Sequence, residues 1–316
     1  MIKIGEAPQA SVNFTPYIGY AVMRVVAVNP TGEELFKIAG MGLGPETFCG
    51  KNDQNIDWAQ VNIWLGPADD NPQVPFVKLP IRLFRQVRKN KEGSKVKVID
   101  HYGNTAWVTN EQFQKQEIPL SKSGIALPII PPYELCCVNQ DVLTDFIRTW
   151  ANIRQSFSWD NDKKAFVKKA DEELKECECK LDRLKNLWVG DFSEIKQFVE
   201  PLRDYKIKVL LMVRNVVIKG VERDLQSVFP QVLPYYRDFD ALRKAYEKEV
   251  ANGGFKNTRT EFRDAEPYVK ASVAAQAAAV NGQYASTADP YSTIGEAQTP
   301  TMAPASQPMA DDDLPF

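Results

Sequence analysis

Short stretches of β-branched and aromatic residues recur about every ten residues in the first third of the chain, and they constrain the fold more than any other feature. Turn-forming residues, such as the run Asn29-Pro30-Thr31-Gly32, separate these stretches. The predicted strands span residues 17–28, 61–65, 74–87, 95–100 and 105–109. Several short strands joined by turns favour a small barrel or a sandwich.

Two features qualify this pattern. Pro75 and Pro80 interrupt the stretch 74–87, so we expect an edge strand or a bulge there. Residues 32–55 contain the run Gly40-Met-Gly-Leu-Gly44, but it lacks the GK[ST] ending of a phosphate-binding loop and the continuation of a dinucleotide fingerprint. We interpret residues 32–55 as a flexible connection.

The hydrophobic period changes from two to helical after Pro132. A first helix is predicted from about Asp141. A second begins near Asp162 and ends at Gly190, and a third begins at Ser193. The second is the longest periodic element, with apolar residues at 3-4-3-4 spacing: Leu174, Cys177, Leu181, Leu184 and Trp188.

The second and third helices together predict a helical hairpin inserted at about residues 160–204. Its heptad pattern could support a dimer, but it extends over only about two heptads, which favours packing on its own neighbour. Strand character returns at residues 206–218, which we expect to complete the sheet. A last helix is predicted over residues 235–250, with Phe239, Leu242 and Tyr246 facing inward.

Charge is distributed unevenly along the 316 residues. Residues 271–316 hold five acids and no Lys or Arg, which leaves 36 acids against 39 bases in residues 1–270. The same segment is rich in Ala, Gln, Ser, Thr and Pro and offers little apolar surface to bury, so we expect it to be disordered. The sequence therefore predicts a mildly basic body, residues 1–270, and an acidic tail.

The chain ends in six residues that suit another protein's pocket. Three adjacent carboxylates remain solvated, and the terminal aromatic ring carries a free carboxylate beside it. A pocket with an apolar hole and a basic rim would accept both. The six residues are Asp311, Asp312, Asp313, Leu314, Pro315 and Phe316.

This ending, DDDLPF, resembles the acidic tip of bacterial single-stranded DNA-binding proteins, which usually reads DDDIPF. The resemblance covers only the tip and the character of the tail. It implies that the tip recruits replication, repair and recombination proteins. It also implies a body with an oligonucleotide/oligosaccharide-binding (OB) barrel, although the body lacks the sequence pattern of the short bacterial family and is much longer. A divergent, phage-encoded relative explains both observations.

Residues 78–97 are the best candidate for binding a single strand, which needs cations for phosphates and flat rings for unstacked bases. Parity along the strand puts Arg82 and Phe84 on one side and Arg85 on the other. The candidate residues are Lys78, Arg82, Phe84, Arg85, Arg88, Lys89, Lys91, Lys95, Lys97, Tyr102 and Trp107. The alternative is a solvated hairpin whose lysines protect a sheet edge, with Phe84 and Trp107 in the core.

The sequence thus predicts an α+β, OB-fold-like small barrel with a helical insertion and a disordered acidic tail. The predicted function is non-catalytic coating of single-stranded DNA in replication, recombination and repair. A strand-annealing recombination protein is the alternative, and a nuclease is a further one. Complementary strands mixed with the protein separate the first two, and magnesium-dependent cleavage would indicate the nuclease.

No cofactor or metal is expected. The five cysteines lack the spacing of a zinc site, although a cluster formed in space stays open, and His101 is the only histidine. An odd number of cysteines fits a reduced compartment. No apolar run approaches the roughly 18 residues of a membrane helix, and the start is not a signal peptide, so a cytoplasmic protein of a bacterial cell is expected.

Overall fold

A computed structural model of the chain describes residues 15–42, 46–70, 72–179 and 184–270. It has an α+β fold dominated by antiparallel strands. The long strands form one sheet in the order β12-β11-β1-β3-β4-β8. These strands are β1 (Tyr17–Val28), β3 (Asp57–Pro67), β4 (Val77–Val87), β8 (Cys137–Val138), β11 (Lys206–Ile218) and β12 (Val221–Val228). The predicted strands at residues 17–28 and 206–218 are therefore confirmed, and β11 pairs directly with β1.

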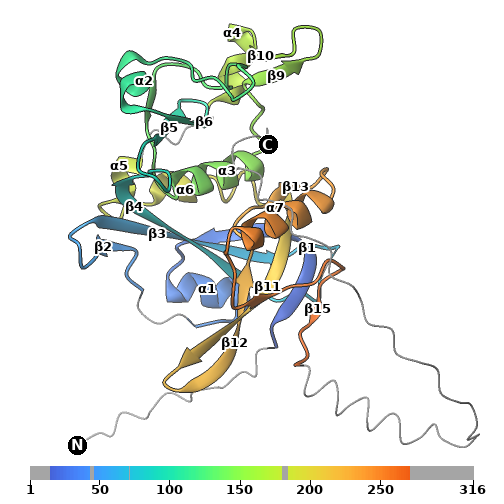
Figure 1. Cartoon of the computed structure of the whole chain (residues 1–316). Helices are drawn as coiled ribbons and strands as arrows, with labels where there is room; N and C mark the ends of the chain where they lie inside the picture. The colour runs from blue at the N-terminus through green and yellow to red at the C-terminus, as the bar shows by residue number, and fades with distance from the viewer. Residues whose placement is uncertain (1–14, 43–45, 71, 180–183, 271–316) are drawn as a thin grey trace, which may run out of the picture. The chain divides into compact units, whose positions relative to one another are not determined.

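The main sheet curls into a half-barrel (Figure 1). β12 and β4 contact each other across the opening, although no hydrogen-bonded pairing joins them within the described residues. Short strands extend the sheet at its margins: β2 (Cys49–Lys51) pairs with β3, β13 (Leu233–Pro234) and β14 (Thr258–Arg259) pair with β11, and β15 (Glu266–Pro267) pairs with β1.

Strict alternation along β4 separates the core from the surface. Val77, Leu79, Ile81 and Leu83 are buried, whereas the residues between them point outward. Pro80 lies opposite Asn62 of β3, and β8 joins the other edge of β4 only at Phe84 and Val87. The expected proline-containing edge is confirmed, because the missing donor of Pro80 faces the unpaired side of β4.

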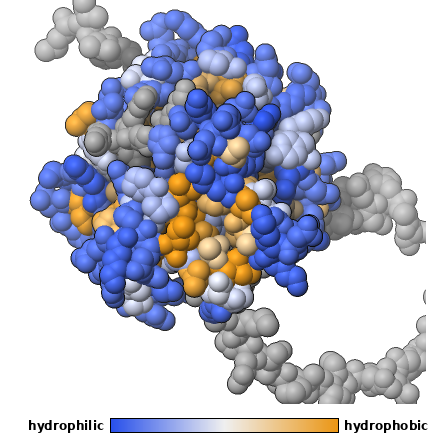
Figure 2. All heavy atoms as spheres, turned by 90° about the horizontal axis from the view of Figure 1, so that it is seen from above, coloured by the Kyte–Doolittle hydropathy of each residue, from blue (hydrophilic) through white to orange (hydrophobic). Residues whose placement is uncertain are grey.

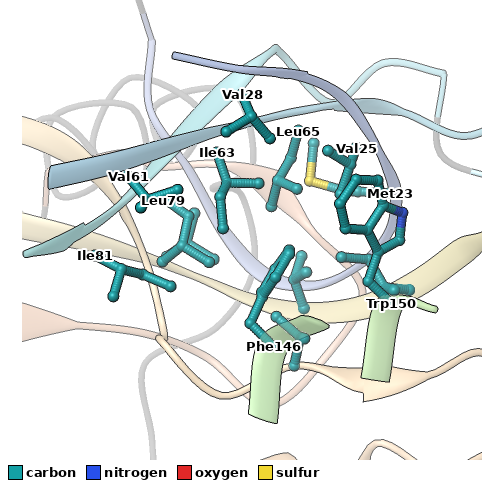
Figure 3. Close-up of a cluster of buried hydrophobic side chains, with 14 of the residues drawn as sticks. Met23, Val25, Val28, Val61, Ile63, Leu65, Leu79, Ile81, Phe146 and Trp150 are labelled. Atoms are coloured by element: carbon teal, nitrogen blue, oxygen red, sulfur yellow. The ribbon is translucent and has the colours of Figure 1, made fainter. Parts of the chain in front are cut away.

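The inner face of the sheet packs against α3 (Gln140–Trp150). Figure 3 shows Phe146 and Trp150 rising from this helix toward the side chains of β1, β3 and β4. Both rings are almost fully buried. The helix predicted from Asp141 is confirmed, and truncating either ring would cost about 3–5 kcal/mol.

Two further helices cover parts of the outer face. α7 (Asp240–Ala251) buries Leu242 and Tyr246 against Leu210 and Met212 of β11, as predicted for the last helix. α1 (Gly32–Ala39) packs Leu35 against Trp64 of β3.

The presence of α1 corrects the prediction of a flexible connection. Thr31 and Glu34 form a capping box: the Glu34 amide donates to Thr31 Oγ1 (3.2 Å), and the Thr31 amide donates to Glu34 Oε2 (2.7 Å). This T-x-x-E signature offsets the effect of the glycines that follow, because it satisfies two backbone donors at the start of the helix.

The predicted strands at residues 95–100 and 105–109 do not join the main sheet, which is a second correction. They are β5 (Val96–Asp100) and β6 (Thr105–Val108), and with β7 (Tyr133–Leu135) they form a separate three-stranded sheet. This small sheet and α2 (Asn110–Lys115) have their own apolar cluster around Val98, Val108 and Tyr133.

The helical hairpin predicted at about residues 160–204 is wrong. Its first part is a β-hairpin of β9 (Phe157–Asp160) and β10 (Ala165–Lys168). The described remainder holds only short helices: α4 (Asp171–Leu174), the 3-10 helix η1 (Lys175–Cys177), α5 (Leu184–Leu187) and α6 (Ser193–Lys196).

Local chemistry explains the hairpin. Phe157, Trp159 and Phe166 are strand formers, and they flank a polar turn in which the amides of Asp162 and Lys163 donate to Asp160 Oδ1. The apolar positions of the predicted helix are nevertheless partly buried, because Leu174 and Cys177 pack inward from α4 and η1. Leu181 lies outside the described residues.

Hydrophilic side chains predominate on the face shown in Figure 2, although apolar ones gather in a patch near its centre. Hydropathy therefore does not mark a site by itself on this face. A site has to be recognised from contacts between named residues.

Candidate nucleic-acid interface

The most exposed part of the predicted site lies on the outer face of β3 and β4. The strand register places Gln60 opposite Arg82 and Trp58 opposite Phe84. The Arg82 guanidinium lies 4.7 Å from the centroid of the Trp58 ring, and its Nε and Nη2 donate to Gln60 Oε1 at 2.9 and 2.7 Å. The cation is thus held over the ring. We call Trp58, Gln60, Arg82 and Phe84 the β3–β4 face.

Arg85 lies on the opposite side of β4, next to the end of this face. Its Nη1 lies 3.4 Å from Asp57, and Lys51 of β2 lies 3.7 Å from the same carboxyl group. Two cations therefore share one carboxylate. Both cationic side chains are exposed, so these ion pairs are weak and a phosphate could replace them at small cost.

Three more cations follow on the turn that leads from β4 to the small sheet. Lys89, Lys91 and Lys95 are exposed and form no ion pair within the described chain. The turn is ordered by Asn90, whose Oδ1 accepts from the Lys95 amide at 3.0 Å. Gly93 has a φ of 71°, which favours glycine at this position.

The other two cations of the run are turned inward. Arg88 Nη1 and Lys97 Nζ both donate to Asp141 Oδ2, each at 2.5 Å. Asp141 is the second residue of α3, and its side chain is only 7% exposed. We call Arg88, Lys97 and Asp141 the buried junction, because it ties the end of β4 and the small sheet to α3.

Electrostatics keep the buried junction charged. Burial alone would raise the pKa of Asp141, but the adjacent Lys97 ammonium and Arg88 guanidinium hold its pKa below the ordinary carboxyl value. Two cations already committed to a buried carboxylate are poor phosphate ligands. Arg88 and Lys97 are thus turned toward Asp141 and not toward solvent with the other cations, and their part in binding DNA stays a prediction.

The remaining predicted residues are dispersed. Lys78 points outward from β4 but pairs with Glu46 at 2.9 Å. Trp107 lies opposite Lys97 on the small sheet, with Lys97 Nζ 5.7 Å from its ring. Tyr102 occupies a turn beside His101, with ring centroids 5.4 Å apart. The structure puts Lys78, Arg82 and Phe84 on one side of β4 and Arg85 on the other, and it does not bring Tyr102 or Trp107 to them.

Sequence reasoning missed Trp58 and Lys51. The predicted strand began at Val61, whereas β3 begins at Asp57. Val61 and Ala59 are buried, so extending the period-two pattern backward would have turned Gln60 and Trp58 outward. Lys51 had no comparable signal, because its position depends on the pairing of β2 with β3.

The cysteines are all free thiols. Cys136 is buried, and burial raises the pKa of its thiol to about 12, with the nearby Asp141 carboxylate adding to the shift. Within the described ranges, no three His, Cys, Asp or Glu side chains are placed to hold a metal ion. In the same ranges, no helix has the length and apolar character required to cross a membrane.

The tail and its tip, Asp311 to Phe316, lie outside the described residues. No protein family, curated protein or solved structure matches the chain.

Proposed function

We propose that this protein binds and coats single-stranded DNA without catalysing a reaction, and that its C-terminal tip recruits replication, recombination and repair proteins. The observation that carries the proposal is the β3–β4 face, where Arg82 lies beside Trp58 and Phe84, with the exposed Arg85 on the opposite side of the same strand end. Cations next to exposed ring surface are what an unpaired strand requires. The terminal DDDLPF supplies independent support through its resemblance to the bacterial tip.

The geometry of the face suits a single strand better than a duplex. Arg82 covers part of the Trp58 ring, and Trp58 and Phe84 are both half-buried, so each ring keeps part of its surface exposed at the sheet. Bases can stack there only after they leave a duplex. Gln60 orients Arg82 before any ligand arrives, which lowers the entropic cost of binding.

We further propose that the curled sheet is a divergent OB-like barrel. Antiparallel strands that nearly close between β12 and β4 are compatible with such a barrel. The localisation that accords with this role is the cytoplasm of a bacterial cell, with the protein acting as a phage product.

Fluorescence titration tests the proposed function. Tryptophan emission of the full chain is followed while an oligothymidylate or a duplex of equal length is added at low ionic strength. The single strand is expected to quench emission and to bind more tightly than the duplex. Binding should weaken with salt by a slope of about −0.7 per phosphate contacted.

The Arg82→Ala/Arg85→Ala variant makes the titration specific to the β3–β4 face. Loss of two phosphate contacts should reduce the salt slope by about 1.4. Lys115→Ala on α2 removes an exposed cation elsewhere and should leave the slope unchanged. Failure of the unmodified protein to bind any single strand would refute the proposal. Rapid pairing of complementary strands would instead identify an annealing protein.

A further inference from the structure

A second group of cations and aromatic rings lies on the outer face of the same sheet, where β11 begins. Lys208 Nζ is 4.6 Å from the ring centroid of Phe239 and 5.7 Å from that of Tyr235. Lys206 Nζ is 5.5 Å from Tyr235. These residues come from β11 and from the segment that joins β13 to α7 (Figure 1). None of them belongs to the candidate site within residues 78–97.

The rings in this group are unusually accessible. Tyr235 is 48% exposed and Tyr236 is 75% exposed. Two neighbouring tyrosines that keep so much surface in water gain apolar contact when a flat ligand covers them. We call Lys206, Lys208, Tyr235, Tyr236 and Arg237 the tyrosine patch.

Two of its three cations form no ion pair with the acidic side chains that the structure describes. Lys208 donates to the backbone oxygen of Arg237 at 2.6 Å and forms no ion pair within the described residues. The exposed guanidinium of Arg237 also forms no ion pair within the described residues. Lys206, in contrast, is paired with Asp70 at 2.7 Å. Lys208 and Arg237 therefore provide positive charge that a phosphate can neutralise.

The strand register relates the tyrosine patch to the β3–β4 face. Arg24 of β1 lies opposite Lys206 of β11 and opposite Gly66 of β3. Gly66 shares its side of β3 with Trp64, which lies opposite the outward-pointing Lys78. Both surfaces are consequently on the outer side of the sheet. With strands about 4.8 Å apart and a rise of about 3.3 Å per residue, they are separated by roughly 25 Å.

We propose that the tyrosine patch is a second contact for the single strand held at the β3–β4 face. Bases stack on Tyr235 and Tyr236, while Lys208 and Arg237 contact phosphates. This inference rests on the proposed function and extends it, because it predicts that a strand must be long enough to reach both surfaces before it binds at full strength. Single-strand sites of about 4–16 nucleotides are usual for one barrel.

The test compares fluorescently labelled oligothymidylates of two lengths, about 5 and about 20 nucleotides, by polarisation. The Tyr236→Ala/Arg237→Ala variant of the full chain should bind the long strand about tenfold more weakly, because one stacked base contributes about 1–3 kcal/mol. Its affinity for the short strand, which reaches only one surface, should change much less. Its salt slope on the long strand should fall by about 0.7.

Trp159→Ala is the control, since Trp159 is an exposed aromatic residue (45%) on the β9–β10 hairpin, outside both surfaces. An equal thermal midpoint for each variant excludes unfolding. Long-strand affinity within twofold of the unmodified protein would overturn the inference, provided that Arg82→Ala/Arg85→Ala still weakens binding. Tighter binding by the Tyr236→Ala/Arg237→Ala variant would also overturn it, because the patch would then hold a competing anion such as the acidic tip. No binding by the unmodified protein would refute the proposed function itself.

Discussion

Two groups of cations that are neighbours in sequence have opposite environments in the fold. At the end of β4, Arg82 on the β3–β4 face and Arg85 on the opposite side of the strand are both exposed. Arg82 donates to the uncharged Gln60, and Arg85 forms only a weak, exposed ion pair with Asp57. In the buried junction, Arg88 and Lys97 share one carboxylate oxygen of Asp141. The comparison teaches that a basic run in a sequence is an upper limit on the charge available to a ligand. Some cations of such a run can instead form ion pairs that join elements of the fold.

The largest effect is expected from a substitution that breaks the buried junction. Asp141→Asn leaves two cations without their carboxylate, and we expect a loss of about 3 kcal/mol in the free energy of unfolding. Urea denaturation measures this loss. Asp57→Asn, beside the β3–β4 face, is the matched change, and we expect a loss of less than about 1 kcal/mol there because the ion pairs of Asp57 are with exposed cations. Equal losses for the two variants would remove the distinction between the groups.

The pH dependence of the unfolding free energy also tests the difference between the buried junction and the exposed cations. The folded-state pKa of Asp141 is lowered, so its contribution is fully present above the unfolded carboxyl pKa of about 3.9. It is lost as the pH falls through the folded-state pKa. The difference in unfolding free energy between the unmodified protein and Asp141→Asn should therefore stay constant above about pH 5 and shrink below about pH 4. A difference that grows on acidification would contradict the assignment.

Removing one tryptophan ring from each region distinguishes the two regions by the resulting change in DNA affinity. Trp58→Ala should weaken single-strand binding about tenfold, since stacking contributes about 1–3 kcal/mol per base. Trp107→Ala, beside the buried junction, should change affinity less than about twofold. Polarisation with a labelled oligothymidylate measures both, and Trp58→Phe should retain most of the affinity. A larger loss from Trp107→Ala would move the site to the small sheet.

The turn lysines lie between the two regions and have a smaller expected effect. If Lys89, Lys91 and Lys95 each contact a phosphate, replacing all three with Ala should reduce the salt slope by about 2. Stability should change by less than about 0.5 kcal/mol, because none of the three forms an ion pair within the described structure. An unchanged slope would confine the site to the β3–β4 face.

The smallest expected effect concerns the tail. Deleting residues 311–316 should tighten single-strand binding about twofold at low salt, because an anionic tail competes with DNA for exposed cations. The difference should vanish at high salt as charges are screened. Loss of binding on deletion would show that the tip is part of the DNA site.

Local pattern predicted much of the fold. The strand at residues 17–28 and the helices at α3 and α7 follow from periodicity, and parity correctly turned Arg82 outward. The capping box at Thr31 was also readable but was missed. The β9–β10 hairpin was missed because the apolar spacing that follows it was extended back across a polar turn.

The division of the basic run could not be predicted in the same way. Asp141 lies 44 residues after Lys97 and 53 after Arg88, and their contact depends on how the small sheet meets α3. Nothing in the residues around position 90 indicates that partner. The tyrosine patch is hidden for the same reason, since Lys208 and Tyr235 approach only through the pairing of β13 with β11.

Ultraviolet cross-linking of the full chain to an oligothymidylate, followed by peptide mapping, tests the central claim most directly. We predict that the cross-links fall on Trp58 or Phe84 and disappear in Arg82→Ala/Arg85→Ala. Cross-links confined to residues 96–108, or none at low ionic strength, would contradict the assignment of single-strand binding to the β3–β4 face.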